Sequence, residues 1–184
     1  MKLSIAGTGY VGLVTAVCLA EKGHQVTCVD VDENKIEQMK QGKSPIYEPG
    51  LEELMLRNSS RLTFTTNYRE AYRDADAIFI GVGTPEKRDG SANLSYIYKV
   101  AEQIAESLEQ DCVVVIKSTV PIGTNDKIEA FLKSRLKSGV QIRLAPNPEF
   151  LAQGTAIRDT LHASRIVIGV EDAVSEQVMR EVYQ

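Results

Sequence analysis

Short runs of apolar residues alternate along the chain with longer segments in which apolar positions recur every three or four residues. The short runs have the length and the Val/Ile-rich composition of strands, and the longer segments have the period of helices. Strands are expected at residues 2–6, 25–30, 62–66, 77–81, 112–117, 142–145 and 165–170. Helices are expected at residues 10–22, 33–41, 67–73, 94–109, 125–138 and 173–183.

Several of the expected strands are apolar throughout, as in Val113-Val114-Val115-Ile116. A strand needs this composition when helices cover both faces of its sheet. The alternation of strand and helix therefore predicts an α/β fold of the doubly wound Rossmann type, a mostly parallel sheet with helices on both faces and right-handed crossovers.

Composition limits the classes of protein to which the chain can belong. Its 184 residues fit a single domain, and 43% apolar with 25% charged residues is ordinary for a globular one. The formal net charge of −4 disfavours a nucleic-acid binder, which needs a basic surface. No apolar stretch is long enough to cross a bilayer, and no signal peptide is recognisable at the N-terminus. Three scattered cysteines make no disulfide framework, so we expect a cytoplasmic protein.

The turn after the first expected strand carries the motif G-x-G-x-x-G, formed by Gly7, Gly9 and Gly12. In this motif the first glycine makes the tight turn, the second lets the backbone approach a pyrophosphate, and the third lets the helix pack on the strand. The N–H groups and the dipole at the start of the following helix favour an anion. The motif therefore predicts a dinucleotide site.

Asp30 ends the second expected strand, where its carboxylate can accept hydrogen bonds from ribose hydroxyls. A carboxylate there repels a 2′-phosphate, and Val31 and Asp32 follow it without an arginine. The sequence therefore favours NAD over NADP. Lys35 is the nearby cation that could reach the ribose or the diphosphate, although a solvated surface lysine explains it equally well.

Three further loops follow expected strands at their carboxyl ends, where open α/β sheets bind ligands. The loops at 81–85 and 117–124 offer the hydroxyls of Thr84, Ser118 and Thr119, which could also serve as helix caps. In the loop at 146–154 two prolines hold the backbone extended and fix the direction of Glu149. That carboxylate is a candidate general base, or else a first-turn residue favoured by the helix dipole.

With these loops the chain resembles the UDP-glucose 6-dehydrogenase family, within the wider group of nucleotide-sugar dehydrogenases. The matching segments follow in family order at residues 7–12, 44–52, 83–85, 89–94, 117–121 and 147–151. The resemblance implies that the C6 alcohol of UDP-glucose is oxidised to a carboxylate while two NAD are reduced. The stretch Ser91-Ala92-Asn93-Leu94 leans towards UDP-glucose over GDP-mannose or UDP-N-acetylhexosamine.

The resemblance also implies roles for individual residues. The NAD-binding residues would be Gly7, Gly9, Tyr10, Val11, Gly12, Asp30, Lys35, Thr84, Thr119 and Gln153. Thr119 would lie beside the nicotinamide and help to position a water, and Glu149 would act in acid–base work on that water during thioester hydrolysis. The sugar-nucleotide site would be lined by Glu149, Phe150, Leu151 and Ala152.

The chain departs from the family pattern at two points. Gln153 stands where the family usually has a second glutamate, and an amide can donate and accept hydrogen bonds but cannot act as a base. The catalytic cysteine of the family lies in a second, UDP-binding domain, beyond a central dimerising helix. We therefore expect residues 1–184 to be the NAD-binding domain of a longer homodimeric protein, with the chain ending inside a helix. We expect this domain to be inactive by itself, because the pattern around Cys18, Cys28 and Cys112 indicates buried structural residues.

Parts of the sequence pattern also occur in other kinds of protein. An NAD-sensing module without chemistry would explain the glycines and Asp30, but not the loops around Thr119 and Glu149. Short-chain dehydrogenases need Tyr-x-x-x-Lys, and none of the seven tyrosines has a lysine at that spacing. No metal site is expected, because His24 and His162 are the two histidines, and His24 is expected at the surface of a turn.

Overall fold

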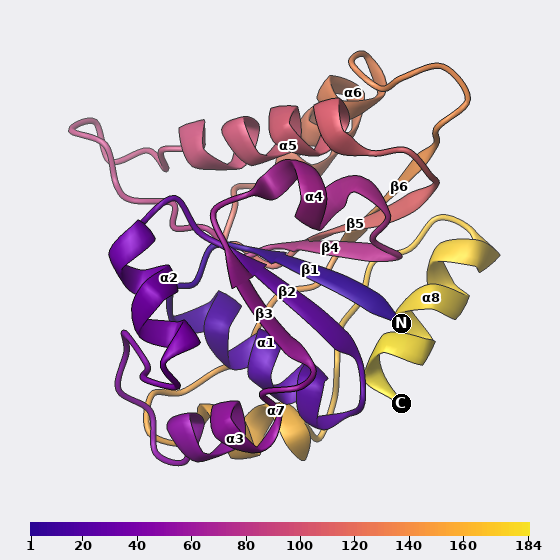
Figure 1. Ribbon diagram of the computed structural model, residues 1–184. Helices are drawn as coiled ribbons and strands as arrows, with labels where there is room; N and C mark the ends of the chain where they lie inside the picture. The colour runs from indigo at the N-terminus through magenta and orange to yellow at the C-terminus, as the bar shows by residue number, and fades with distance from the viewer.

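A six-stranded parallel sheet forms the centre of the protein in the computed structural model, which describes residues 1–184 (Figure 1). Its strands are β1 (Lys2–Ala6), β2 (Gln25–Val29), β3 (Leu62–Thr65), β4 (Ala77–Ile80), β5 (Cys112–Ile116) and β6 (Ile142–Pro146). They lie in the order β3-β2-β1-β4-β5-β6, so the chain changes direction across the sheet between β1 and β4. Ligands of open α/β sheets bind at the carboxyl ends of the strands at such a point.

Helices cover both faces of this sheet, which confirms the doubly wound fold predicted from the sequence (Figure 1). One face carries α1 (Tyr10–Glu21), α2 (Glu33–Lys40), α3 (Leu51–Arg57), α7 (Ala156–Leu161) and α8 (Ala173–Tyr183). The other face carries α4 (Tyr68–Arg73), α5 (Ser95–Ser107) and α6 (Thr124–Lys133). The helices therefore shield the strands from water on both sides.

Successive residues of each central strand enter two separate cores. In β5, Val113 and Val115 pack in the core under α1, whereas Val114 and Ile116 pack in the core under α5. All residues of this strand are buried. Because side chains alternate across a strand, an apolar side chain is required at every position.

The expected strand at 165–170 is wrong, since no strand forms there. The segment runs beside the end of β6, where the Gly169 N–H donates to the Pro146 carbonyl at 2.8 Å. Pro146 has no N–H to return, and Pro148 follows two residues later, so a regular ladder cannot be completed on this side of β6.

Two short helices, α3 and α7, lie in segments where the sequence predicted no helix. Each is too short to show a clear helical repeat of apolar residues. α6 also ends at Lys133, earlier than the apolar pattern suggested. Helix ends are poorly determined by the pattern because capping and packing decide them.

His24 was expected at the surface, but its side chain is buried at 8% exposure. One ring nitrogen lies 2.9 Å from the Val182 carbonyl near the end of α8, and the other lies 3.4 Å from the N-terminal amine. The Lys22 ammonium donates to the Tyr183 carbonyl at 3.0 Å. The turn before β2 therefore satisfies carbonyls at the end of the last helix, a pairing that no local pattern could indicate.

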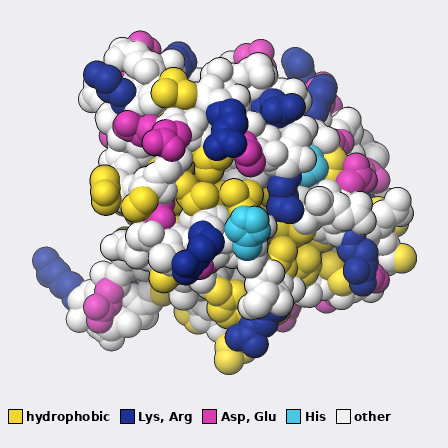
Figure 2. Space-filling view, turned by 90° about the horizontal axis from the view of Figure 1, so that it is seen from below, with side chains coloured by type: hydrophobic (Ala, Val, Ile, Leu, Met, Phe, Trp, Pro, Cys, Tyr) yellow, Lys and Arg dark blue, Asp and Glu magenta, His cyan; other side chains and the backbone are white.

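The side of the molecule formed by α3 and α7 mixes apolar and charged side chains, as Figure 2 shows. Leu56 and Phe150 are among the large apolar residues exposed on the molecule. None of the helices has the length and apolar character needed to span a membrane.

Candidate functional site

The glycine loop, residues 7–12, joins β1 to α1 at the point where the strand order reverses. Gly7 has φ +92°, a conformation that other residues rarely adopt. A Cβ on Gly12 would lie 1.9 Å from the Gly7 carbonyl oxygen, whereas a Cβ on Gly9 would meet no atom within 4 Å. Gly12 thus permits the close contact of helix and turn, and Gly9 leaves open space at the start of α1.

No side chain caps the first turn of α1, because its N-cap residue is Gly9. The N–H groups at the start of a helix point outward and carry partial positive charge. Beside open space, these groups fit the diphosphate of a dinucleotide. Tyr10 and Val11, which the resemblance assigned to this role through their main chain, form the beginning of that turn.

Asp30 lies directly after β2 and is held by its neighbours. Its Oδ2 accepts from the Thr8 N–H at 2.9 Å and from the Thr8 hydroxyl at 2.6 Å, and its Oδ1 accepts from the Asp32 N–H at 3.1 Å. Burial by itself raises the pKa of the carboxyl, but these hydrogen bonds and the charge of Lys35 lower the pKa below its ordinary value. A carboxylate can accept about four hydrogen bonds, so capacity remains for a ribose hydroxyl.

A groove of about 360 Å³ opens above the carboxyl ends of β1, β2 and β4. Gly7, Gly9, Asp30 and Lys35 line it together, so the structure brings these predicted residues into one site. Val31 and Val82 give it apolar walls of the kind that an adenine ring requires.

The groove is also lined by residues that the sequence analysis did not select. They are Thr66, Tyr68, Tyr72, Tyr96, Lys99, Val100 and Gln103. Tyr96 and Tyr98 lie near the start of α5 and have different surroundings. Tyr98 does pack on Phe131, at 5.1 Å between ring centroids, but Tyr96 is 54% exposed at the groove. The sequence feature that could have identified these groove residues is the spacing of Tyr96, Lys99 and Gln103, which places them on one side of α5.

The loops after β4 and β5 are tied together. The Thr84 hydroxyl donates to the Thr119 carbonyl at 2.9 Å, and the Ser118 hydroxyl donates to the Val82 carbonyl at 2.7 Å. These hydroxyls therefore join two loops, and the cap of α6 is Gly123. The Thr119 side chain is exposed at this junction.

Glu149 lies half-buried in the loop after β6, beside a small cavity of about 50 Å³. Phe150 and Leu151 line the same cavity, whereas Ala152 and Gln153 are exposed further along the loop. The guanidinium of Arg165 lies 5.3 Å from the centre of the Phe150 ring.

Lys117 is a chemically notable residue that sequence reasoning missed. Its side chain is buried beside the cavity of Glu149, and its Nζ donates to Asn147 Oδ1 at 3.2 Å. Burial lowers the pKa of Lys117 to about 8, and the charge of Glu149 opposes this shift. Asn147 also accepts from the Tyr183 hydroxyl and donates to the Val167 carbonyl at 2.9 Å, so three segments meet at this amide.

Tyr10 turns its side chain away from the groove, towards the loop that carries Glu149. Its hydroxyl donates to Glu48 Oε2 at 2.5 Å. Glu48 also accepts from the N–H groups of Gly154 at 2.8 Å and Ala156 at 2.9 Å. The segment at 44–52 thus links the glycine loop to the loop after β6, which the sequence alone did not reveal.

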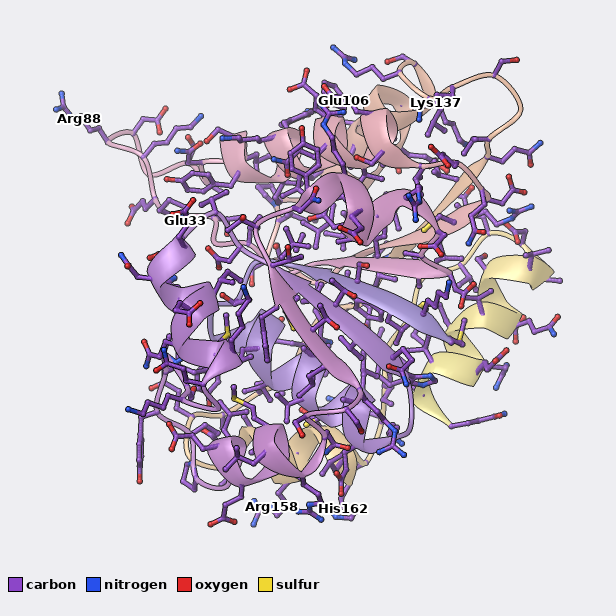
Figure 3. The ribbon with its side chains drawn as sticks, in the orientation of Figure 1. Glu33, Arg88, Glu106, Lys137, Arg158 and His162 are labelled. Carbon is purple, nitrogen blue, oxygen red and sulfur yellow. The ribbon has the colours of Figure 1, made fainter.

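No three His, Cys, Asp or Glu side chains group closely enough to hold a metal ion. Arg158 of α7 and His162, which directly follows this helix, are exposed at the bottom of the molecule as drawn in Figure 3. Cys18, Cys28 and Cys112 are buried free thiols. Burial raises the pKa of Cys18 and of Cys28 to about 12, and it raises the pKa of Cys112 as well.

Comparison with known proteins adds to this geometry. A family model described as the UDP-glucose/GDP-mannose dehydrogenase family, NAD binding domain, matches residues 1–184. The UDP-glucose 6-dehydrogenase YwqF of Bacillus subtilis is 52% identical over the whole chain, and the UDP-glucose 6-dehydrogenase of Rhizobium meliloti is 48% identical. The chain spans 42% of the first relative and 43% of the second, less than half of their length.

Solved structures give the same picture. A UDP-glucose dehydrogenase from Pyrobaculum islandicum superposes on 98% of the chain with a TM-score of 0.94 and 41% identity. A GDP-mannose dehydrogenase from Pseudomonas aeruginosa superposes on the whole chain with a TM-score of 0.92 and 41% identity. The chain covers 43% and 44% of these two structures, respectively.

Proposed function

Because the chain belongs to the UDP-glucose/GDP-mannose dehydrogenase family, as its NAD-binding domain, we propose that it is the NAD-binding half of an enzyme that oxidises UDP-glucose to UDP-glucuronate. The observation that carries this proposal is that the groove and the loops of Thr119 and Glu149 all lie at the edge of the sheet where its parallel strands end, with Thr84 hydrogen-bonded to Thr119 between two of these loops. A module that merely sensed NAD would need the groove but not the buried Lys117 beside Glu149.

In this proposal the chain holds the two ends of NAD by different means. The start of α1, with Gly7, Gly9 and the main chain of Tyr10 and Val11, binds the diphosphate, and Gly12 keeps α1 close to β1. Asp30 accepts from the adenosine ribose, and Lys35 lies on the same wall of the groove. Thr84 and Thr119 face the nicotinamide end, where Gln153 donates to or accepts from the carboxamide.

Bound NAD supplies the hydride acceptor for the carbon that is oxidised. Thr119 would position a water beside that carbon, and Glu149 would accept a proton from the water as it hydrolyses the thioester between the oxidised carbon and a cysteine outside these residues. The carbon–sulfur bond breaks, the cysteine leaves as the thiol and the carboxylate is formed. Lys117 lines the same small cavity as Glu149, and the prolines on either side of Asn147 hold the loop extended, which fixes the direction of the Glu149 side chain. Phe150, Leu151 and Ala152 line the place of the sugar nucleotide.

The choice of nucleotide sugar rests on the names of the relatives and on one stretch of the chain. Relatives named UDP-glucose 6-dehydrogenases and the stretch 91–94 favour UDP-glucose. The likeness to a GDP-mannose dehydrogenase makes GDP-mannose the second candidate, and UDP-N-acetylhexosamines follow. The remaining length of a homodimeric enzyme would bring the other contacts to the nucleotide.

Calorimetry and a spectroscopic assay test the proposal together. The 184-residue protein is expected to bind NAD and to produce no NADH when UDP-glucose is added, because its three thiols are buried and protonated. Full-length YwqF serves as the active control. Absence of NAD binding would remove the basis of the proposal, and steady NADH production would contradict the expected need for a thiol outside these residues.

A further inference from the structure

Glu48 is a buried carboxylate, 5% exposed, with no basic side chain among its hydrogen-bond partners. Burial by itself raises its pKa, but hydrogen bonds from Tyr10, Gly154, Ala156 and Ile157 lower the pKa below its ordinary value. The negative charge is thus held entirely by neutral donors. A buried charge that loses such donors is strongly destabilised, so the donors must stay in place for Glu48 to stay where it is.

These donors come from two segments that are far apart in the sequence. Tyr10 is the first residue of α1 and belongs to the glycine loop, whereas Gly154 and Ala156 lie at the end of the loop that carries Glu149 and at the start of α7. The Tyr10 hydroxyl also lies 3.5 Å from the Ala152 carbonyl. Glu48 therefore sits between the backbone that faces the diphosphate and the loop at 147–155.

The main chain and the side chain of Tyr10 belong to different parts of the site. Its main chain opens the first turn of α1, beside the open space at Gly9, and its side chain leaves that turn in the direction of Glu48. A ligand that immobilises the first turn of α1 also immobilises the phenol ring. The ring in turn fixes one oxygen of the carboxylate, and that same oxygen accepts from the Gly154 N–H.

We propose that Glu48 is a positioning residue, through which NAD bound at the glycine loop steadies the loop at 147–155 by way of the Tyr10 hydroxyl. This inference rests on the proposed function, since it couples two parts of that site. NAD bound in the groove favours the fixed form of the loop that carries Glu149 and Gln153.

A simpler role for Glu48 is to satisfy the N–H groups at the start of α7, because the side chain of the N-cap residue, Thr155, accepts from no backbone N–H of the helix. That role requires Gly154 and Ala156 but not Tyr10. The two interpretations therefore differ in a single hydroxyl group, which Tyr10→Phe removes while Glu48 and its backbone donors remain.

Amide hydrogen exchange of the peptide that spans residues 152–157, with and without saturating NAD, is the deciding measurement. In the unchanged protein NAD is expected to slow exchange by about tenfold, and in Tyr10→Phe by less than about twofold. Tyr47→Phe is the matched control, because it removes the hydroxyl of a neighbouring tyrosine that is 89% exposed. That control is expected to behave like the unchanged protein.

Glu48→Gln provides a second, independent variant. The amide keeps the size of the side chain but directs an N–H₂ group at one of the donors, so the loop is expected to exchange faster even without NAD. If the Tyr10–Glu48 contact carries the effect, the double variant Tyr10→Phe/Glu48→Gln adds nothing to the loss of NAD-dependent protection seen in Glu48→Gln alone.

Equal NAD-dependent protection in Tyr10→Phe and in the unchanged protein overturns the inference, as does the lack of any NAD-dependent protection in the unchanged protein. Calorimetry on the unchanged protein separates these outcomes from a failure of the proposed function. If NAD releases heat there while the loop is unaffected, the NAD site stands and the role of Glu48 does not.

Discussion

Asp30 shows how one side chain can serve both the fold and a ligand. Its carboxylate anchors the buried Thr8 of the glycine loop by two hydrogen bonds, and it also faces the groove. The ribose can therefore be held by a group whose direction is fixed before the ligand arrives, which lowers the entropic cost of binding.

Replacing Asp30 with Ala is expected to lower the affinity for NAD by about 10- to 100-fold, the range for losing a hydrogen bond to a charged acceptor. The preference for NAD over NADP should shrink in parallel, because the charge that repels a 2′-phosphate is lost. Calorimetric titration with both dinucleotides measures the two effects.

Thr8→Val separates stability from binding in that experiment. The variant removes the 2.6 Å hydrogen bond of the hydroxyl to Asp30 but keeps the carboxylate in the groove. It is expected to be less stable and to bind NAD nearly as well. An unchanged affinity in Asp30→Ala would show that the ribose lies elsewhere.

The burial of Lys117 predicts how the free energy of unfolding depends on pH. Its pKa is about 8 in the folded protein and 10.5 in the ordinary state, so the unfolded chain binds more protons between these values. Stability must therefore rise with pH across this window, since the cost of burying the ammonium is relieved.

Chemical denaturation at two pH values tests this sign, with Lys117→Met as the reference. Relative to that variant, the unchanged protein should gain about 2 kcal/mol in its free energy of unfolding between pH 7 and pH 9.5. A difference that stays constant, or falls, over this range would mean that the ammonium is not desolvated.

The residues that could be predicted from the sequence are those whose surroundings are local. Gly7, Gly12 and Asp30 act within one strand–turn–helix unit and its neighbouring strand, so spacing identified them. Glu48, Lys117 and His24 depend on partners far along the chain, such as Ala156, Asn147 and Val182. No pattern within a short window contains such partners.

At the scale of elements, the unit of β1, the glycine loop and α1 carries both packing and binding. Nine residues of α1, from Gly12 to Ala20, are buried, so packing contacts on all sides fix the position of the helix. A small displacement of α1 would move the N–H groups at its start away from the groove. The geometry of the binding turn is thus set by the core.

Gly9→Ala and Gly12→Ala are expected to separate these two roles. A methyl group on Gly12 would meet the Gly7 carbonyl at 1.9 Å, so this variant should lose several kcal/mol of stability, on the order of a severe overpacking, or fail to fold. A methyl group on Gly9 meets nothing in the protein, so that variant should keep its stability.

The effect of Gly9→Ala is instead expected on the affinity for NAD. Gly9→Ala should weaken binding by about tenfold or more, because its methyl group occupies the space that the pyrophosphate needs. Thermal unfolding and calorimetry measure the two properties. Equal loss of stability in both variants, or full NAD affinity in Gly9→Ala, would contradict this division of roles.

Elements were predicted well where their residues repeat apolar positions over a full strand or several helical turns. The six strands and the longer helices have this property, although their ends shift by a few residues. α3 and α7 do not, and α7 depends on Glu48 for hydrogen bonds at its start. The segment at 165–170 has the composition of a strand but lies beside a strand end without the necessary N–H.

At the scale of the whole molecule, two cores share one sheet, and each contains cysteine. Cys18 and Cys28 lie in the core under α1, and Cys112 lies in the core under α5. Burial holds all three thiols in the protonated form. Their reactivity therefore reports on opening of either side of the molecule.

A thiol-specific reagent is expected to label these cysteines slowly in the native protein and completely under denaturing conditions. NAD at about one hundred times its dissociation constant should slow labelling by about a hundredfold if the molecule opens as one unit. Labelled cysteines identified by mass spectrometry check this expectation. Rapid labelling of one cysteine, unaffected by NAD, would show that its core opens independently.

The proline that ends β6 has a consequence for contacts between copies of this protein. β6 is the last strand of the sheet, and an outer strand with free N–H and carbonyl groups can recruit a strand from another molecule and start fibril growth. Pro146, followed by Pro148, interrupts the row of donors at the end of this strand. The two prolines that prevent a seventh strand from pairing with β6 thus also oppose pairing of this edge with a strand of another molecule.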